Sequence, residues 1–294
     1  MTGVQTCALP ISVEMDTDKK YLLMGADISG IQKFIFNIGS KGAYKNLKGR
    51  SFFMQVLPYL IARRILDAID MDENQIIYLT GGHFYLMLPN TDGVKTAVTK
   101  TFEDINFELY KDFSGRLYVR SGYRELSPLE LKDKKFSTTW DELSRTISLS
   151  DYNRYAELAV DDYDIIFKPR NGREIDFSTF GMHLRNGDDI LYITKSNERT
   201  DTVFLGYNLV FRKEFNGAGD IVIALNPEKM PKTAMNFFYM PVGGLSGFDK
   251  DFEDIAKGST GSHLLGILRM DVDNLGKVFR DGFKNYRSYT NSPL

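Results

Sequence analysis

Residues 21–36, YLLMGADISGIQKFIF, decide how the N-terminal half of the chain is organised. An apolar run leads to Asp27, and a Ser-Gly turn at Ser29 and Gly30 then opens a helical segment. A short apolar run that is bounded by turn residues is typical of a buried strand. The stretch therefore predicts a strand that passes directly into a helix, with Asp27 where the strand ends.

The residues that follow extend this pattern to a whole domain. Residues 47–70 carry apolar side chains at helical spacing, and two strand-like runs flank Gly81 and Gly82, which is a hairpin signal. A further helix and a last strand complete the order βαββαβ, the ferredoxin-like arrangement. We therefore expect an α+β fold in which residues 20–126 place both helices on one face of a four-stranded antiparallel sheet.

Residues 127–245 are expected to form a second unit that is helical first and β-rich afterwards. Residues 127–160 are charged and show helical spacing, with Trp140 as a core anchor. Beyond them the periods shorten, and Asn-Gly, Gly-Asp and Gly-Ala-Gly turns separate strand-like runs. These runs are residues 162–168, 174–184, 188–195, 202–211, 220–226 and 235–242.

One turn in this region, Asn186-Gly187-Asp188-Asp189, resembles the Gly-Asp-Asp hairpin of polymerases. No Asp-bearing strand stands in the correct place before it. Asn-Gly is a strong signal for a tight hairpin. We therefore interpret the stretch as an ordinary hairpin turn between two strands.

A second pattern of strand, Asp, turn and helix occurs at residues 264–279, LLGILRMDVDNLGKVF. Residues two apart on a strand face the same way, so Asp271 and Asp273 would point to one spot, roughly 7 Å apart. At an effective dielectric constant near 20 their repulsion costs about 2 kcal/mol, which a divalent cation between them would offset. The alternative is a strand end that is capped by acidic turn residues. Asp27 corresponds to Asp271 in this weak internal repeat.

Composition limits the classes of function. The chain has 294 residues, a net charge of −2 and 43% hydrophobic residues, which is enough for two domains. The near-neutral charge argues against bulk electrostatic binding of nucleic acid and leaves room only for a local basic patch. The single cysteine, Cys7, excludes a disulfide framework and a zinc site built from cysteines. No apolar run approaches the length of a membrane-spanning helix, and none of the three histidines precedes an aspartate.

The first residues do not match the rest of the chain. MTGVQTCALPIS, residues 1–12, lacks a basic start and is a poor signal peptide. It resembles the translated sequencing-adapter scar that occurs at the ends of metagenomic reading frames. We therefore expect residues 1–15 to be a non-native, disordered leader on a truncated gene.

Four motifs in a fixed order now identify a family. They are GADISGIQKFIF, KGAYKNLKGRSFF, TGGHFYLMLPN and GILRMDVDNLGKVF. Together they resemble the large subunit of type III-A CRISPR effector complexes, the Csm-type member of the Cas-ten family, over about residues 20–125 and 262–283.

The resemblance implies a prokaryotic, cytoplasmic antiviral protein. Family members carry a His-Asp nuclease domain that cuts single-stranded DNA, two palm domains separated by a linker domain with a zinc site, and a helical C-terminal domain. The palms bind ATP, and the second palm joins ATP into cyclic oligoadenylates with Mg²⁺ or Mn²⁺ held by carboxylates on its first strand and by a Gly-Gly-Asp-Asp hairpin. Target RNA activates the assembled complex, so the implied partners are other Csm-type subunits, guide RNA and target RNA, with no membrane.

This chain departs from the family pattern. The His-Asp domain, the cysteines of the zinc site and the Gly-Gly-Asp-Asp hairpin are absent. We therefore expect a piece: a first palm at residues 20–126, a linker domain at 127–245 and the truncated start of a second palm at 262–294. No complete catalytic site is expected in this chain, and the piece alone is expected to show neither cyclase nor DNase activity.

The resemblance assigns site residues to both palms. Asp271 and Asp273 would be metal ligands of the second palm. In the first palm, Gly81-Gly82-His83-Phe84 stands where an acidic hairpin would be, so this palm is expected to bind ATP without catalysis. The residues expected to bind ATP are Asp27, Ser29, Gly30, Gln32, Lys33, Arg50, Ser51, Gly81, Gly82 and His83.

For two parts of this set, the residue types alone, without the family resemblance, also suggest a role in binding ATP. The turn from Ser29 to Lys33 offers backbone N–H groups and one cation, which suits a phosphate or ribose; the alternative is a Ser-Gly turn before an ordinary helix. Arg50 ends a basic loop that would face triphosphate or RNA, or would simply be solvated. The other basic residues of that loop are Lys41, Lys45 and Lys48.

A binding module is the alternative function. A ferredoxin-like sheet is also the architecture of RNA-recognition domains, in which aromatic strand residues stack on bases. The chain would then be a non-catalytic scaffold for RNA and protein. The strand TGGHFYLMLP lacks the basic-Gly-aromatic pattern of that family, and binding of RNA without ATP would favour this alternative.

Overall fold

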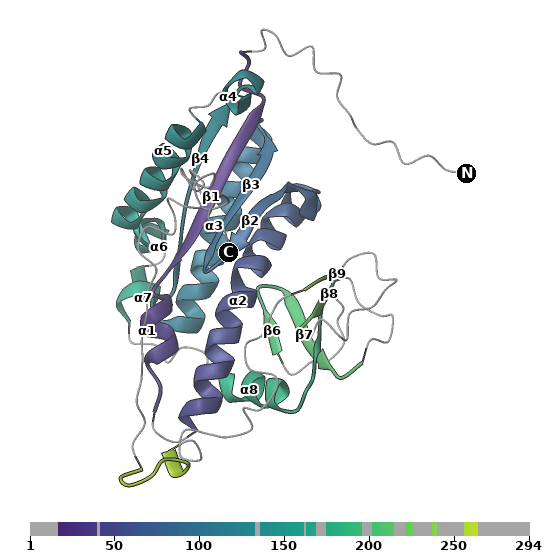
Figure 1. Cartoon of the computed structure of the whole chain (residues 1–294). Helices are drawn as coiled ribbons and strands as arrows, with labels where there is room; N and C mark the ends of the chain where they lie inside the picture. The colour runs from purple at the N-terminus through teal and green to yellow at the C-terminus, as the bar shows by residue number, and fades with distance from the viewer. Residues whose placement is uncertain are drawn as a thin grey trace, which may run out of the picture.

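A computed structural model describes most of the chain (Figure 1). The described residues are 17–39, 42–132, 136–161, 163–168, 175–195, 202–214, 221–225, 237–239 and 256–263. The expected leader, residues 1–15, lies outside them, as do Asp271, Asp273 and the rest of residues 264–294. Within the described residues, no helix is both long enough and apolar enough to span a bilayer.

The N-terminal half has the ferredoxin-like order that the sequence predicts. Its sheet has the strand order β2-β3-β1-β4, with every neighbouring pair antiparallel. The strands are β1 (Tyr21–Ser29), β2 (Ile76–Thr80), β3 (His83–Pro89) and β4 (Tyr118–Leu126). The helices are α1 (Ile31–Phe36), α2 (Ala43–Ala68) and α3 (Asp92–Phe113), with a 3₁₀ turn, η1 (Glu73–Gln75), before β2.

Strand β1 is buried on both faces, which explains its continuous apolar run. Its even-numbered residues, from Leu22 to Ile28, join the main core with α2 and α3. On the opposite face Leu23 packs with Leu143 of α5 (Phe136–Leu149), and Trp140 of α5 lies 4.1 Å from Tyr85, between ring centroids. Trp140 is therefore part of a second core, as predicted.

The described part of residues 127–245 is helical first and then β-rich. The helical segments are α4 (Pro128–Lys132), α5, η2 (Ser150–Asn153), α6 (Ala156–Asp161), α7 (Tyr163–Phe167) and α8 (Phe177–Arg185). The second sheet has the order β6-β7-β5-β8-β9. Its strands are β5 (Ile190–Thr194), β6 (Thr202–Phe204), β7 (Tyr207–Arg212), β8 (Ile221–Ala224) and β9 (Phe237–Tyr239).

Two of the expected strands, at residues 162–168 and 174–184, are wrong. The first is α7, in which the rings of Tyr163 and Phe167 stack one helical turn apart, with centroids at 4.2 Å. The second is α8, which begins at a cap where the Asp176 carboxylate accepts a hydrogen bond from the Ser178 N–H. Its buried residues recur every three or four positions, which is the spacing of a helix and not the alternation of a strand. They are Phe177, Phe180, Gly181 and Leu184.

The Asn186-Gly187-Asp188-Asp189 stretch is a turn, as expected, but it is not a hairpin. It ends α8, and the Asp188 N–H donates to the His183 carbonyl at 3.1 Å. Gly187 has φ +70°. Both features are those of a Schellman helix end, which places a left-handed glycine after the cap.

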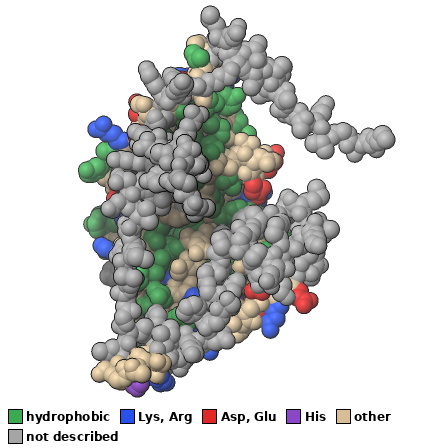
Figure 2. Space-filling model, viewed as in Figure 1, with side chains coloured by type: hydrophobic (Ala, Val, Ile, Leu, Met, Phe, Trp, Pro, Cys, Tyr) green, Lys and Arg blue, Asp and Glu red, His purple; other side chains and the backbone are tan. Residues whose placement is uncertain are grey.

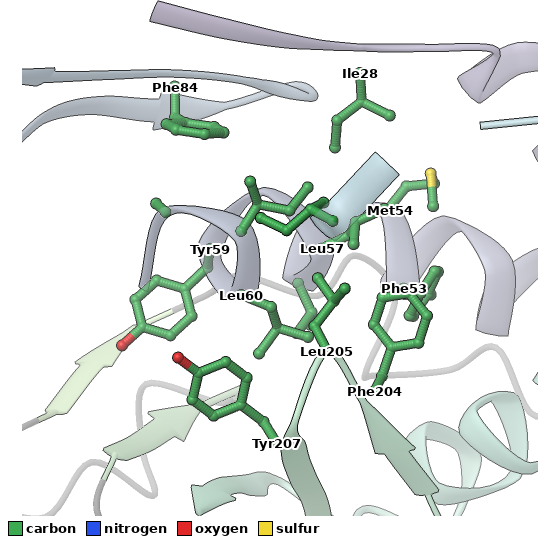
Figure 3. Close-up of a cluster of buried hydrophobic side chains, with 14 of the residues drawn as sticks. Ile28, Phe53, Met54, Leu57, Tyr59, Leu60, Phe84, Phe204, Leu205 and Tyr207 are labelled. Carbon is green, nitrogen blue, oxygen red and sulfur yellow. The ribbon is translucent and has the colours of Figure 1, made fainter. Parts of the chain in front are cut away.

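Helix α2 lies between the two sheets (Figure 1) and belongs to the core of both. Figure 3 shows Leu57 and Leu60 of α2 between Ile28 and Phe84 on one side and Leu205 of the β6–β7 turn on the other. A helix that is apolar around most of its surface is buried on several sides. The two halves of the described chain therefore share one continuous core.

Two further contacts join α2 to elements of the second half of the chain, α8 and the second sheet. A Cβ atom at Gly49 would lie 1.8 Å from the Phe177 carbonyl oxygen, so α8 crosses α2 at backbone distance. At the other end of α2, the Asp67 carboxylate accepts from Tyr207 at 2.5 Å and pairs with Lys195 and Arg63, each at 2.7 Å. We call these four residues the helix-end cluster.

Candidate functional site

The candidate site lies where β1 ends, on the sheet face that carries α5. Asp27 and Ser29 are two apart on the strand, so their side chains leave the same face, opposite to the buried Ile28. In the sheet register, Asp27 lies opposite His83 of β3 and Arg120 of β4. Three neighbouring strands therefore bring polar side chains to one place.

The carboxylate of Asp27 is buried and held by cationic or donor groups on both sides. Its Oδ1 lies 3.0 Å from His83 Nε2, and its Oδ2 accepts from the Arg120 guanidinium. The residue is only 7% exposed, and a buried carboxylate needs such partners to offset its lost hydration. We call Asp27, His83 and Arg120 the strand-end cluster.

The carboxylate of the strand-end cluster is fully used by protein partners. Both carboxylate oxygens of Asp27 are engaged by the protein, and no group of three or more His, Cys, Asp or Glu residues that could hold a metal occurs among the described residues. Arg120 was missed from the sequence, although cross-strand pairing places it opposite Asp27. Both ring nitrogens of His83 already have partners, Asp27 and the Gly81 carbonyl, so the Arg120 guanidinium is the cation that the cluster can offer to a phosphate group.

The turn after β1 is fixed by close backbone contacts. Gly30 has φ +93°, and a Cβ atom there would lie 2.0 Å from the Arg116 carbonyl oxygen. Only glycine fits this conformation and this space. The Ile28 N–H donates to the Gly82 carbonyl at 2.9 Å, which ties the β2–β3 hairpin tip to the same turn. Gly81 and Gly82 thus shape the site through their backbone.

A residue that the sequence analysis did not single out, Arg154, contacts this turn from outside the palm-like domain. Its guanidinium donates to Ser29 Oγ at 3.3 Å and to the Gly115 carbonyl at 2.5 Å. It lies 5.2 Å from the ring centroids of both Tyr118 and Tyr155. No local sequence signal marks Arg154, because its partners besides the adjacent Tyr155 come from two distant segments, at the end of β1 and at the start of β4.

The expected role of Arg50 is not what the structure shows. Its guanidinium donates at 2.7 Å to the carbonyls of Phe34 and Asn37 and packs over the Phe34 ring. Burial, and secondarily the charge of Arg116, lowers the pKa of Arg50. Arg50 therefore caps the C-terminal end of α1, and its described contacts do not reach the strand-end cluster.

The remaining predicted ATP ligands are more dispersed. Gln32 and Lys33 are exposed on α1, and Ser51 is half-buried on α2. The expected basic loop is wrong: Lys45, Lys48 and Arg50 lie on α2, and Lys41 lies outside the described residues. The ammonium group of Lys48 lies 5.6 Å from the Tyr44 ring centroid. On the face seen in Figure 2, the described Lys and Arg side chains are scattered rather than gathered in one patch. The structure therefore brings together Asp27, Ser29, the turn glycines and His83, and separates Arg50 from them.

Comparison with known proteins identifies the family of the chain. The family model for Csm1 subunit domain B matches residues 20–169. A curated relative from Mycobacterium tuberculosis, the CRISPR system single-strand-specific deoxyribonuclease Cas10/Csm1 of subtype III-A, is 28% identical over 312 residues, which cover 90% of this chain and 38% of the relative. The Streptococcus thermophilus protein of the same description is 32% identical over 143 residues, 47% of this chain and 19% of that protein.

Solved structures show the same fold. A Csm1–Csm4 cassette in complex with one ATP aligns with a TM-score of 0.67 at 21% identity, over 84% of this chain and 34% of that chain. A cassette in complex with cA4 aligns with a TM-score of 0.67 at 20% identity, over 90% of this chain and 36% of that chain. The chain thus spans about two fifths of the length of the relatives that it matches along most of its own length. The family match covers more than half of the sequence, and the chain belongs to the Csm1 family, whose curated members here are the Cas10/Csm1 proteins of subtype III-A CRISPR systems.

Proposed function

We propose that this chain supplies the first palm and the adjoining linker region of a type III-A CRISPR large subunit, and that the first palm binds ATP. The observation that carries the proposal is the strand-end cluster beside the Ser29–Gly30 turn, in a chain of the Csm1 family. Arginine donors suit phosphate oxygens, and a serine hydroxyl suits a phosphate or ribose. Solved Csm1–Csm4 cassettes with ATP and with AMPPNP support a nucleotide as the ligand.

For the whole subunit we propose antiviral defence in two activities. Its palms would join ATP into cyclic oligoadenylates when target RNA binds, and a His-Asp domain would cut single-stranded DNA. Cassettes solved with cA3, cA4 and pppApApA, and the deoxyribonuclease description of the curated relatives, support these activities. Asp271 and Asp273, outside the described residues, would hold the Mg²⁺ or Mn²⁺ that assists the transfer.

The partners follow from the same reasoning. Other Csm-type subunits, guide RNA and target RNA would assemble with this chain in the prokaryotic cytoplasm. The solved relatives contain Csm4, which supports contact with another subunit of the complex.

The structure disfavours the RNA-binding scaffold as the sole function. In RNA-recognition sheets, exposed aromatic side chains stack on bases. In β3, Phe84 is fully buried in the main core and Tyr85 packs against Trp140. Neither aromatic residue is available to a base from solution.

The test is a direct binding measurement on the chain as it exists. We expect isothermal titration calorimetry to detect saturable binding of ATP, and we expect radiolabelled ATP to remain unconverted, because Asp27 is already neutralised by protein groups. Single-stranded RNA is titrated in parallel. Binding of RNA with no binding of ATP would reject the proposed function in favour of the scaffold.

A further inference from the structure

We propose that Arg154 is a further binding residue of the first palm and that its guanidinium contacts the phosphate groups of the nucleotide. This inference rests on the proposed function and extends it to a residue outside the ferredoxin-like domain. The Ser29 hydroxyl, which the sequence already places in the site, is the group that Arg154 contacts at 3.3 Å. A ligand phosphate at the end of β1 would therefore lie within reach of Arg154.

No carboxylate of the described part of the chain forms an ion pair with Arg154. Among the described residues Arg154 forms no ion pair, and the same holds for Arg116 on the loop that contacts Gly30. The charge of Arg116 also contributes, after burial, to lowering the pKa of Arg50. An arginine that forms no ion pair is a favourable partner for a polyanion such as a triphosphate.

The guanidinium of Arg154 is held in position before any ligand arrives. It lies 5.2 Å from the ring centroids of both Tyr118 and Tyr155, which pack edge-on against each other with centroids 4.9 Å apart. Its hydrogen bonds to Ser29 and Gly115 hold it beside the end of β1, and Tyr155 is a further hydrogen-bond partner. A guanidinium that is already fixed by its neighbours loses little freedom when it binds phosphate.

The backbone next to Arg154 is strained in a way that fits a ligand site. Tyr155 has φ +59°, a conformation that side chains other than glycine rarely adopt. Its hydroxyl donates to the Leu117 carbonyl at 2.7 Å, and its ring packs edge-on to Tyr110 with centroids at 4.9 Å. Strained residues persist where surrounding contacts fix them, and they gather at ligand clamps. Here the strained residue directly follows Arg154, whose guanidinium contacts the end of β1.

The experiment separates a phosphate contact from a structural clamp by the number of phosphates on the ligand. Adenosine, AMP, ATP and inorganic tripolyphosphate are titrated into the natural chain and into Arg154→Gln, Arg154→Lys and Arg145→Gln, where Arg145 is an exposed arginine on α5. We expect Arg154→Gln to lose about tenfold in affinity for ATP and tripolyphosphate, the cost of one charge-assisted hydrogen bond, and to keep its affinity for adenosine. Arg154→Lys should recover part of the loss, and Arg145→Gln should match the natural chain.

Each other outcome is decisive. Equal losses for adenosine and ATP, or no loss at all, would overturn the inference and leave Arg154 a structural residue. If the natural chain binds tripolyphosphate through Arg154 but not ATP, Arg154 is a general anion-binding residue, and both the inference about the nucleotide and the proposed function fail. If it binds neither, both fail. Should Arg154→Gln not fold, as judged by circular dichroism, the Lys variant and Ser29→Ala provide the same comparison of ligands.

Discussion

The strand-end cluster and the helix-end cluster both neutralise a carboxylate, but they obtain their partners differently. His83 and Arg120 lie directly opposite Asp27 on neighbouring strands, so the register of one sheet brings them together. Asp67 instead draws partners from its own helix and from the second sheet. The first cluster is a property of one sheet, and the second joins two halves of the molecule.

This difference separates two roles for buried charge. The strand-end cluster lies beside the Ser29–Gly30 turn, where we propose that a nucleotide binds, so changing it should affect both stability and ligand affinity. The helix-end cluster closes the contact between α2 and the second sheet, so changing it should affect stability alone. Variants of the two clusters can therefore be compared on the same two measurements.

The largest effect is expected from Arg120→Met. Removing the guanidinium leaves the Asp27 carboxylate buried with His83 as its remaining side-chain partner in the cluster, and breaking a buried ion pair from one side costs about 3 kcal/mol of unfolding free energy or more. Urea denaturation measures the loss, and calorimetry should show ATP binding lost with it. Arg124→Met on the same strand is the matched control. Arg124 is exposed, and its ion pair with Glu142 is long, at 3.7 Å, so its loss should cost little. Equal stability of the two variants would contradict the prediction.

A smaller loss is expected from Asp67→Ala. The variant removes the acceptor of three partners, and because the cluster is partly hydrated we expect the unfolding free energy to fall by about 2 kcal/mol. Affinity for ATP should be unchanged. Asp104→Ala is the control, since Asp104 is exposed and pairs with Lys100 at 3.4 Å on one face of α3. A drop in ATP affinity for Asp67→Ala would show that the two clusters are not independent.

The contrast also explains what the sequence could predict. The ferredoxin-like order, the hairpin at Gly81 and Gly82 and the position of Asp27 follow from local periodicity and turn chemistry, and all three are confirmed. Arg120 could have been found, because the expected strand order puts its strand beside β1. These features depend only on neighbours in the chain or in one sheet.

Other features depend on packing between distant segments, which a sequence does not display. In the sequence, the phenylalanines of α8 form a short apolar run that resembles a strand. Their packing against α2, which makes the segment a helix on the surface of that helix, is visible only in the structure. Arg50 reads as part of a basic loop, but the fold turns it inward to the carbonyls at the end of α1. Arg154 has no motif at all. Each of these residues takes its role from a partner more than ten positions away.

The contribution of the helix-end cluster to the unfolding free energy should depend on pH. Burial alone would raise the pKa of Asp67, but hydrogen bonds from Lys195 and Tyr207 and the charge of Arg63 outweigh it, and the pKa is lowered. A carboxyl whose pKa is lowered on folding stabilises fully above its unfolded pKa of about 4 and loses this contribution as the pH falls through its folded pKa. The difference in unfolding free energy between the natural chain and Asp67→Asn should therefore be largest near neutral pH and shrink in acid. Urea denaturation across that range measures it, and a difference that stays constant would contradict the assignment.

The smallest effects come from dividing the helix-end cluster into its parts. Lys195 is 57% exposed, so its ion pair with Asp67 is screened, and Lys195→Met should cost about 0.5 kcal/mol or less, a loss that added salt removes. The Tyr207 hydroxyl is more buried, and burial together with Asp67 raises its pKa, so it stays a protonated donor. Tyr207→Phe should cost about 1 kcal/mol at low and high salt alike. If urea denaturation instead shows the larger and salt-sensitive loss for Lys195→Met, charge rather than the neutral hydrogen bond holds the second sheet against α2.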